Sequence, residues 1–264
     1  MTDAQSDAEQ AGDTAPETAE PAGEELPGGF VSAPLRVGNT VRRQPGSHPE
    51  FVRRLLRFFE QAGFGGAPRF LGEDADGREV VSFVPGYVPW RQAEAQQVRS
   101  AVSLAAAGML LRQCHDLTAR TALAGDSEVV CHNDLSPRNT VYRDLGAGLV
   151  PVAFIDWDVA APGARIHDVA HMCWQYPGLG PAAESGAAAR QLALICDAYG
   201  LADRTSLVDT ILWWQDRCWR GIEAGAAAGN AAMLRIRATG APEAIRQESR
   251  WVEQHKAALQ AAVG

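Results

Sequence analysis

The fold is decided by the stretch Val130-Cys131-His132-Asn133-Asp134-Leu135-Ser136-Pro137-Arg138-Asn139 and its sequel Phe154-Ile155-Asp156-Trp157-Asp158. Between the two, residues 140–155 read as two short strands joined by turn residues, which predicts a β-hairpin. The two ends of a hairpin lie side by side, so Asn139 and Asp156 are expected to be neighbours, with Asp134 on the adjoining loop. Two carboxylates and an amide oxygen at one point suit Mg²⁺ and substrate phosphates.

The spacing of these residues indicates phosphoryl transfer. The pattern is His132-x-Asp134-x-x-x-x-Asn139, with Asp156 following 17 positions after Asn139. Such chemistry needs one carboxylate to align or deprotonate a hydroxyl, and an amide with a second carboxylate to hold the metal that bridges the phosphates. One of these elements alone would be typical of an ordinary Asx-rich turn. Their joint spacing and the hairpin between them favour the catalytic interpretation.

On these residues the chain resembles the aminoglycoside phosphotransferase and choline kinase-like family, which has the protein-kinase-like fold. The resemblance runs from about Gly28 to about Cys173. It implies an α+β, two-lobed architecture, with a small antiparallel β-rich N-lobe and a larger, mostly α-helical C-lobe. It also implies transfer of the γ-phosphate of ATP, with Mg²⁺, to a hydroxyl of an aminoglycoside-, amino-alcohol- or sugar-like small molecule.

The resemblance assigns roles to the motif residues by position. Asp134 corresponds to the catalytic base, and His132 to the histidine that shapes its loop. Asn139 and Asp156 correspond to the Mg²⁺ ligands.

Two further acids follow the motif. Asp158 is expected either to assist the metal site or to bind substrate. Asp168 matches the family's second acidic position, where the carboxylate braces the catalytic loop.

Composition and periodicity divide the chain into three parts. Residues 1–26 are an acidic leader rich in Ala, Glu, Asp and Pro and are expected to be disordered. Residues 27–84 are expected to form the β-rich nucleotide-binding N-lobe. Residues 85–264 are expected to form the α-rich catalytic and substrate-binding C-lobe. The predicted helices lie at 48–62, 93–117, 167–174, 182–199, 206–228 and 242–262.

Charge and composition exclude several classes of protein. Eight acids precede the first basic residue, Arg36, and the remaining chain balances 24 acidic against 24 basic residues. A neutral body argues against a nucleic-acid binder. The sequence has no run of 18 apolar residues that would predict a membrane span, and the acidic leader does not fit a signal peptide. A cytoplasmic location is therefore expected. The five cysteines form no CxxC pair and are expected to be reduced thiols; oligomeric state stays open.

Nucleotide binding requires a loop over the phosphates and a cation. Gly28-Gly29 fits a glycine loop, and it equally fits the end of a linker. The only lysine is Lys256, so Arg42 is the predicted phosphate-binding cation. Arg43 is the alternative, because strand alternation sends only one of the two inward, and a solvated arginine pair is also open.

Two other features of the N-lobe concern the cleft. Phe83 and Val84 stand where the family's interlobe hinge reads the base through backbone groups. The glutamate usual in the family's helix is missing near Phe51-Val52, where only Glu50 is close. This departure leaves open the alternative of a nucleotide-binding pseudokinase with a regulatory role.

The C-terminal part carries two weaker signals. Asp216 and Glu223 lie in an aromatic helical segment that would suit a cationic substrate, although tryptophans at this spacing are more often core residues. His167 and His171 stand at i and i+4, the spacing of a helical zinc site, which gives a second alternative, a zinc hydrolase.

Overall fold

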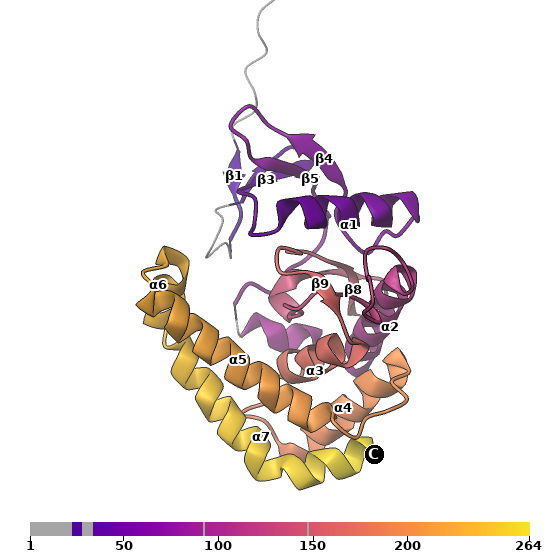
Figure 1. Ribbon diagram of the computed structural model, residues 1–264. Helices are drawn as coiled ribbons and strands as arrows, with labels where there is room; N and C mark the ends of the chain where they lie inside the picture. Colours follow the sequence, from indigo (N-terminus) through magenta and orange to yellow (C-terminus); the bar gives the residue numbers. More distant parts are fainter. Residues whose placement is uncertain (1–22, 28–33, 92, 147) are drawn as a thin grey trace, which may run out of the picture.

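The computed structural model describes residues 23–27, 34–91, 93–146 and 148–264. A small antiparallel sheet with one helix forms the upper part of the molecule in Figure 1, and a larger, mostly helical part lies below it. The predicted α+β, two-lobed kinase-like fold class is therefore confirmed. Residues 1–22 of the expected leader and the expected glycine loop at Gly28-Gly29 lie outside the described residues.

The N-lobe sheet has five strands in the order β1-β2-β3-β5-β4, each antiparallel to its neighbour. The strands are β1 (Glu24–Glu25), β2 (Leu35–Val37), β3 (Thr40–Arg43), β4 (Phe70–Glu73) and β5 (Glu79–Ser82). The tight β2–β3 turn places Gly38 at a φ of +59°, a conformation that glycine adopts without a steric penalty. Four of the five strands, β2 to β5, lie within residues 27–84, where the sequence predicts a β-rich lobe.

Strand β1 was not expected. Glu24 pairs with Arg36 and Glu25 with Leu35, at the edge of the sheet. The edge of β2 carries backbone groups that need hydrogen-bond partners, and β1 supplies them. Residues 24 and 25, which were expected to lie in the leader, therefore belong to the sheet.

Helix α1 (Pro49–Gln61) follows β3 in the chain and packs between the sheet and the lower lobe. Its buried residues Val52, Leu55, Leu56 and Phe59 follow the helical period, so one face of the helix is apolar. The Phe59 ring lies 5.1 Å from the ring of Trp157, which belongs to the C-lobe motif. The helix is thus packed between the sheet and the catalytic part of the molecule (Figure 1).

The connection between the lobes is fastened to the C-lobe at Tyr87. The backbone N–H of Tyr87 donates to Tyr142 O, and that of Tyr142 to Tyr87 O, both at 2.8 Å. Gly86 precedes this bridge and lies so close to strand β7 (Thr140–Asp144) that a Cβ would stand 2.4 Å from Val141 Cγ1. Only glycine fits there, so the path of the chain out of the N-lobe is sterically defined.

The long helix expected over 93–117 is divided. A 3₁₀ segment, η1 (Glu94–Val98), comes first, and helix α2 (Ala101–Thr118) follows. Ser100 is extended, and its Oγ accepts from Ser103 N at 3.1 Å. This N-cap starts a new helix and ends the preceding one, which apolar periodicity alone does not reveal.

The predicted hairpin is present. Strands β7 (Thr140–Asp144) and β8 (Leu149–Phe154) pair in antiparallel register, with Thr140 opposite Phe154. A second, unpredicted pair joins β6 (Val129–Cys131) to β9 (Ala161–Gly163). The catalytic motif leaves β6 and enters β7 through the short 3₁₀ turn η2 (Pro137–Asn139), so both ends of its loop are fixed by sheet pairing.

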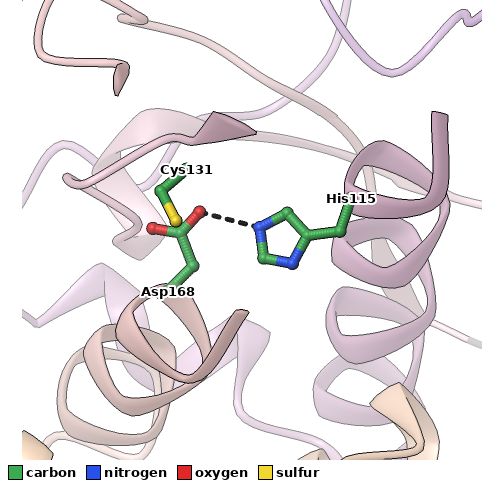
Figure 2. Close-up of side chains that lie close together, drawn as sticks. All are labelled: His115, Cys131 and Asp168. Atoms are coloured by element: carbon green, nitrogen blue, oxygen red, sulfur yellow. Dashed lines mark hydrogen bonds and ion pairs between the residues drawn. The ribbon is translucent and has the colours of Figure 1, made fainter. Parts of the chain in front are cut away.

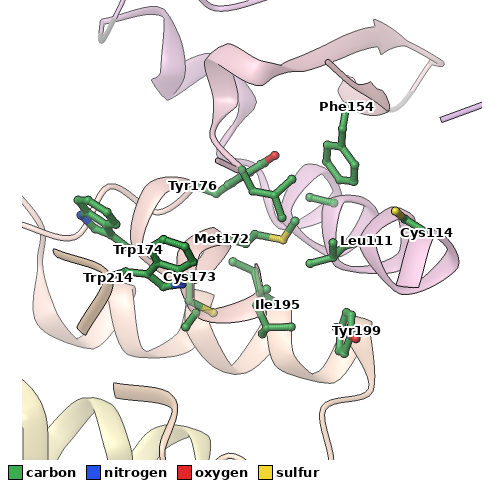
Figure 3. Close-up of a cluster of buried hydrophobic side chains, with 14 of the residues drawn as sticks. Leu111, Cys114, Phe154, Met172, Cys173, Trp174, Tyr176, Ile195, Tyr199 and Trp214 are labelled. Atoms are coloured by element: carbon green, nitrogen blue, oxygen red, sulfur yellow. The ribbon is translucent and has the colours of Figure 1, made fainter. Parts of the chain in front are cut away.

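Five helices complete the C-lobe: α3 (Arg165–Gln175), α4 (Ser185–Tyr199), α5 (Leu207–Ala227), α6 (Ala231–Ala238) and α7 (Ala241–Val263). Four of these helices, α3, α4, α5 and α7, enclose an apolar core together with α2, in which Leu111, Met172 and Ile195 are fully buried (Figure 3). Burial of such side chains is the main term that stabilises the lobe. In the part of the chain that the structure describes, no helix is both long and apolar enough to span a bilayer.

Candidate active site

The loop after β6 presents Asp134 and Asn139 to the cleft between the lobes. Asn139 Nδ2 donates to the backbone oxygen of Asp134 at 2.9 Å and to its Oδ2 at 2.8 Å. Because both donor bonds turn the amide nitrogen toward Asp134, the amide oxygen of Asn139 is left as an acceptor or a metal ligand. The side chains of the proposed base and of one proposed ligand are thus held in direct contact.

The loop after β8 brings Asp156 to the same place. Ile155 N donates to Asn139 O at 2.9 Å, which sets the two loops side by side as the hairpin predicts. Asp156 and Asn133 both adopt left-handed backbone conformations, with φ of 65° and 64°. Such conformations carry strain and concentrate at functional sites, although Asn and Asp tolerate them better than most residues.

Electrostatics raise the pKa of Asp134 to about 7. The largest cause is loss of solvation by the surrounding protein atoms, followed by the negative charge of Asp156. The hydrogen bond from Asn139 and the charge of Arg138 act in the opposite direction. A carboxylate with a pKa near neutrality is matched to proton transfer from a hydroxyl.

His132 joins the two loops. Its Nδ1 accepts from Asp134 N at 3.3 Å, and its Nε2 donates to Ile155 O at 3.0 Å. The ring also packs on Trp157, with 4.5 Å between ring centroids. Burial lowers its pKa, which keeps the imidazole neutral, as one accepting and one donating nitrogen require. Its contacts shape the loop, and none of them reaches the open side of the site.

Asp168 holds the catalytic loop from behind. Its Oδ2 accepts from His132 N at 2.6 Å and its Oδ1 from Asn133 N at 2.9 Å. His115 of α2 donates through Nε2 to Oδ2 at 3.1 Å (Figure 2). On its other side, His115 Nδ1 lies 2.7 Å from the hydroxyl of Tyr199. These hydrogen bonds outweigh burial and lower the pKa of Asp168, so the brace is an ionised carboxylate.

Within the described ranges, His115, Cys131 and Asp168 are the one group of three potential metal ligands that lie close together (Figure 2). All three are buried, and Asp168 and His115 already make the hydrogen bonds given above. We interpret the group as a structural brace.

The zinc alternative involved His167 and His171, which lie outside that group. His171 donates through Nδ1 to Leu135 O at 2.8 Å, and His167 stacks on Trp213 with 5.3 Å between ring centroids. Both histidines have other partners, and no third ligand joins them among the described residues, so the zinc interpretation loses its basis.

Arg43, and not Arg42, faces the site. Arg43 Nη1 lies 2.6 Å from Asp158 Oδ1 and 3.7 Å from Asp156 Oδ1. Arg42 points to the opposite face of the sheet, where its Nη1 lies 3.8 Å from Asp74 Oδ2. The choice of Arg42 is corrected accordingly: strand alternation selects one of the two residues, and the register of β3 determines which.

Glu79 is the partner of Arg43 that sequence reasoning missed. It begins β5, stands directly opposite Arg43 in the sheet, and is 1% exposed. Its Oε2 accepts from Arg43 Nη2 at 3.1 Å. The expected partner was a helical glutamate, whereas the carboxylate comes from the adjacent strand. The signal was available as a charged residue at the start of an otherwise uncharged strand.

Asp158 contacts the N-lobe directly. Burial raises its pKa to about 6, although the charge of Arg43 opposes this shift. Gly46 lies against it, because a Cβ at Gly46 would stand 2.9 Å from Asp158 Cγ. Asp158 thus pairs with Arg43, a contact outside its two expected roles at the metal or the substrate, and these two roles stay predictions.

A cavity of about 230 Å³ opens between the lobes beside these groups. Phe83 and Val84 of the interlobe connection line it on one side, and Asn139 and Asp156 on another. Its remaining wall is largely apolar and includes Leu26, Val41, Leu56, Val81, Val88, Trp90, Val141, Ile155 and Trp157. An apolar slot that ends in convergent polar groups suits a flat base with a charged tail.

Asp216 and Glu223, the acids expected to bind a cationic substrate, already have arginine partners. Asp216 accepts from Arg220 Nε at 2.8 Å, and Glu223 lies 3.5 Å from Arg246 Nη2 and 3.9 Å from Arg237 Nη1. Their charge is compensated within the chain, which weakens them as a recognition site for a cation.

The chain shares sequence with known proteins. Residues 118–207 match the phosphotransferase enzyme family. The chain is 32% identical over 220 residues to the trifolitoxin immunity protein of Rhizobium leguminosarum bv. trifolii, and the match covers 71% of this chain and 78% of that protein.

Solved structures share the fold. A choline/ethanolamine kinase family protein from Mesorhizobium loti superposes with a TM-score of 0.61 at 16% identity, over 93% of this chain and 94% of that one. The GDP complex of aminoglycoside 2'-phosphotransferase-IIIa gives a TM-score of 0.61 at 13% identity, over 89% and 94% of the two chains. At these identities the likeness concerns the fold alone.

Proposed function

Because the chain belongs to the aminoglycoside phosphotransferase and choline kinase-like phosphotransferase family and is thus a small-molecule kinase, we propose that it transfers the γ-phosphate of ATP to a small-molecule hydroxyl with Mg²⁺. The observation that carries the proposal is the convergence of Asp134, Asn139 and Asp156 at the end of a cavity lined by Phe83 and Val84. The acceptor hydroxyl, the phosphates and the nucleotide base then each have a separate place in the site.

The donor set fits Mg²⁺. Asn139 offers its amide oxygen, since its nitrogen is bonded to Asp134, and the Asp156 carboxylate is 54% exposed beside it. Oxygen ligands of this kind are those that Mg²⁺ takes in phosphoryl-transfer sites. When bound, the ion neutralises charge on the phosphates.

The chain's own residues perform the remaining tasks. Asp134 orients the acceptor hydroxyl and takes its proton, for which a pKa near neutrality is suited. Arg43 offers a permanent charge to the phosphates from the N-lobe side. Backbone groups near Phe83 and Val84 receive the base. One fold relative is a GDP complex, so GTP is tested beside ATP.

The proposed acceptors include neutral as well as cationic hydroxyl compounds. Because arginines compensate the charges of Asp216 and Glu223, these acids do not favour cationic aminoglycosides and amino-alcohols over neutral hydroxyl compounds. The relative's name concerns immunity to trifolitoxin, so that toxin belongs in the acceptor panel.

The test is release of ADP or GDP across this panel by the wild-type chain and by Asp134→Asn. On an acceptor that is turned over, the variant is expected to lose about 10²- to 10⁴-fold in kcat while calorimetry still detects nucleotide binding. Equal rates for the two proteins would refute Asp134 as the base. Nucleotide binding without turnover on any acceptor would favour the pseudokinase alternative.

A further inference from the structure

Three charged side chains meet on the face of the N-lobe sheet that α1 covers. Glu79 Oε2 accepts from Arg43 Nη2 at 3.1 Å, and Glu79 Oε1 accepts from Arg53 Nε at 2.9 Å. Arg43 lies on β3 and Arg53 on α1. Each oxygen of one buried carboxylate is therefore bonded to a different arginine, and the carboxylate joins the strand to the helix.

The strand register fixes one half of this arrangement. Arg43 and Glu79 are direct cross-strand partners, so their side chains emerge on the same face and close together. The second edge of the Arg43 guanidinium turns to Asp158 and Asp156. A planar guanidinium has two edges that bind at once, so the bond to Glu79 orients the edge that faces the phosphate site.

The helix supplies the other half. Arg53 stands on the helix in which the family resemblance led us to expect a glutamate. Besides Glu79 it pairs with Glu73 and, at 3.3 Å, with Glu50. The hydrogen bond to Glu79 is the largest cause of its raised pKa, so Arg53 stays charged.

The shared carboxylate has an electrostatic consequence. With Arg43 alone, Glu79 would cancel the charge of that arginine and would keep one buried oxygen without a partner. With Arg53 present, Glu79 is shared between two arginines, so both of its buried oxygens have partners and less of its negative charge is set against Arg43 alone. Arg43 is thereby held in a single orientation toward the site.

We propose that Arg53 is a positioning residue for nucleotide phosphate binding and acts on Arg43 through Glu79. The inference rests on the proposed function. A glutamate was expected on helix α1. Instead the helix supplies the cation Arg53, and strand β5 supplies the carboxylate Glu79.

The test compares Arg53→Gln, Arg53→Lys, Glu79→Gln and the double variant Arg53→Gln/Glu79→Gln. Arg53→Gln is expected to lower kcat/KM for the Mg-nucleotide about tenfold or more, since a charged hydrogen bond is lost, with the acceptor KM unchanged. Arg53→Lys is expected to recover part of the loss. The double variant is expected to be no worse than Glu79→Gln, because Arg53 acts through that carboxylate.

The matched control is Arg54→Gln, which removes the same charge from the exposed neighbouring position of α1 and is expected to leave every constant unchanged. Nucleotide affinity is measured by calorimetry and unfolding by heat, alongside turnover. Additive losses in the double variant, or a lowered Tm for Arg53→Gln with unchanged nucleotide constants, would overturn the inference. A wild-type chain that binds nucleotide without turnover would refute the proposed function alone, since affinities still test Arg53. A wild-type chain that binds neither ATP nor GTP would overturn both proposals.

Discussion

Glu79 in the N-lobe and Asp168 in the C-lobe are buried carboxylates, 1% and 0% exposed, that hold the two sides of the proposed site by different means. Glu79 binds two arginine side chains, from β3 and α1. Asp168 binds two backbone N–H groups of the catalytic loop and one imidazole. On the nucleotide side, Arg43 is therefore oriented by other side chains, whereas the loop on the acceptor side is held through its backbone.

The largest effect is expected for Asp168→Ala, which tests this comparison. The change leaves two buried backbone donors and His115 without their acceptor, and each such group is costly. We expect the free energy of unfolding to fall by about 3 to 5 kcal/mol, measured by urea denaturation. Asp203→Ala, at an exposed acid of the same lobe, is the control. A loss below about 1 kcal/mol would mean that the loop is held by something other than Asp168.

Glu79→Gln is expected to be milder. The amide keeps the shape and one accepting oxygen, so one arginine retains its bond while the other loses a charged partner. We expect a loss of about 2 to 3 kcal/mol in the same denaturation experiment. If Glu79→Gln proved more destabilising than Asp168→Ala, the N-lobe cluster would be the more rigid of the two.

Acid pH is expected to destabilise the C-lobe through His171. Burial lowers the pKa of His171 to about 4, although the hydrogen bond to Leu135 O opposes this shift, so the imidazole is neutral when folded and charged when unfolded below about pH 6.5. Its contribution is complete above pH 6.5 and is lost as the pH falls toward 4. At pH 5 the loss is about 2 kcal/mol.

Denaturation of wild type and His171→Asn between pH 5 and 7.5 measures this effect. The asparagine amide still donates to Leu135 O but does not titrate, so a weaker dependence on pH is expected. Identical pH profiles would assign the effect to other groups, among them His132, whose pKa burial also lowers.

The smallest effect is expected for Tyr199→Phe. The hydroxyl of Tyr199 is hydrogen-bonded to His115 Nδ1 and accepts from Arg165 Nη1 at 3.2 Å, so its loss removes one bond behind the Asp168 brace and one to an arginine. We expect about 1 kcal/mol of destabilisation by urea denaturation, with kcat reduced only slightly. A loss of kcat by more than about tenfold would show that the brace sets catalytic geometry as well as stability.

The C-lobe side was the more predictable from sequence. The motif and the hairpin are local, so residues 130–158 define the two loop ends and their proximity, and the paired strands confirm the hairpin. The assignments of Asp134, Asn139 and Asp156 to base and metal ligands stay predictions. The contributions of His115 and Tyr199 lie on distant helices, and no spacing rule connects them to the loop.

The N-lobe side depended on register, which one sequence does not supply. Alternation limits the cation to Arg42 or Arg43, and only the pairing of Arg43 with Glu79 decides between them. The apparent lack of an acidic partner followed from searching the helix alone. With Glu79 as the partner, the departure that motivated a pseudokinase is a rearrangement of charge between strand and helix.

The bridge between Tyr87 and Tyr142 bears on how nucleotide leaves. Tyr87 is fixed to β7, and Pro85 has a restricted φ while its carbonyl oxygen accepts from Arg143 Nε at 2.8 Å. Phe83 is tied to the N-lobe, because its N–H donates to Asn39 O at 2.8 Å. The torsions left for swinging the lobes apart are concentrated at Val84, which also lines the cavity. In the proposed site, a nucleotide base seated against Val84 would restrain the swivel itself, and product escape and lobe opening would become a single kinetic event.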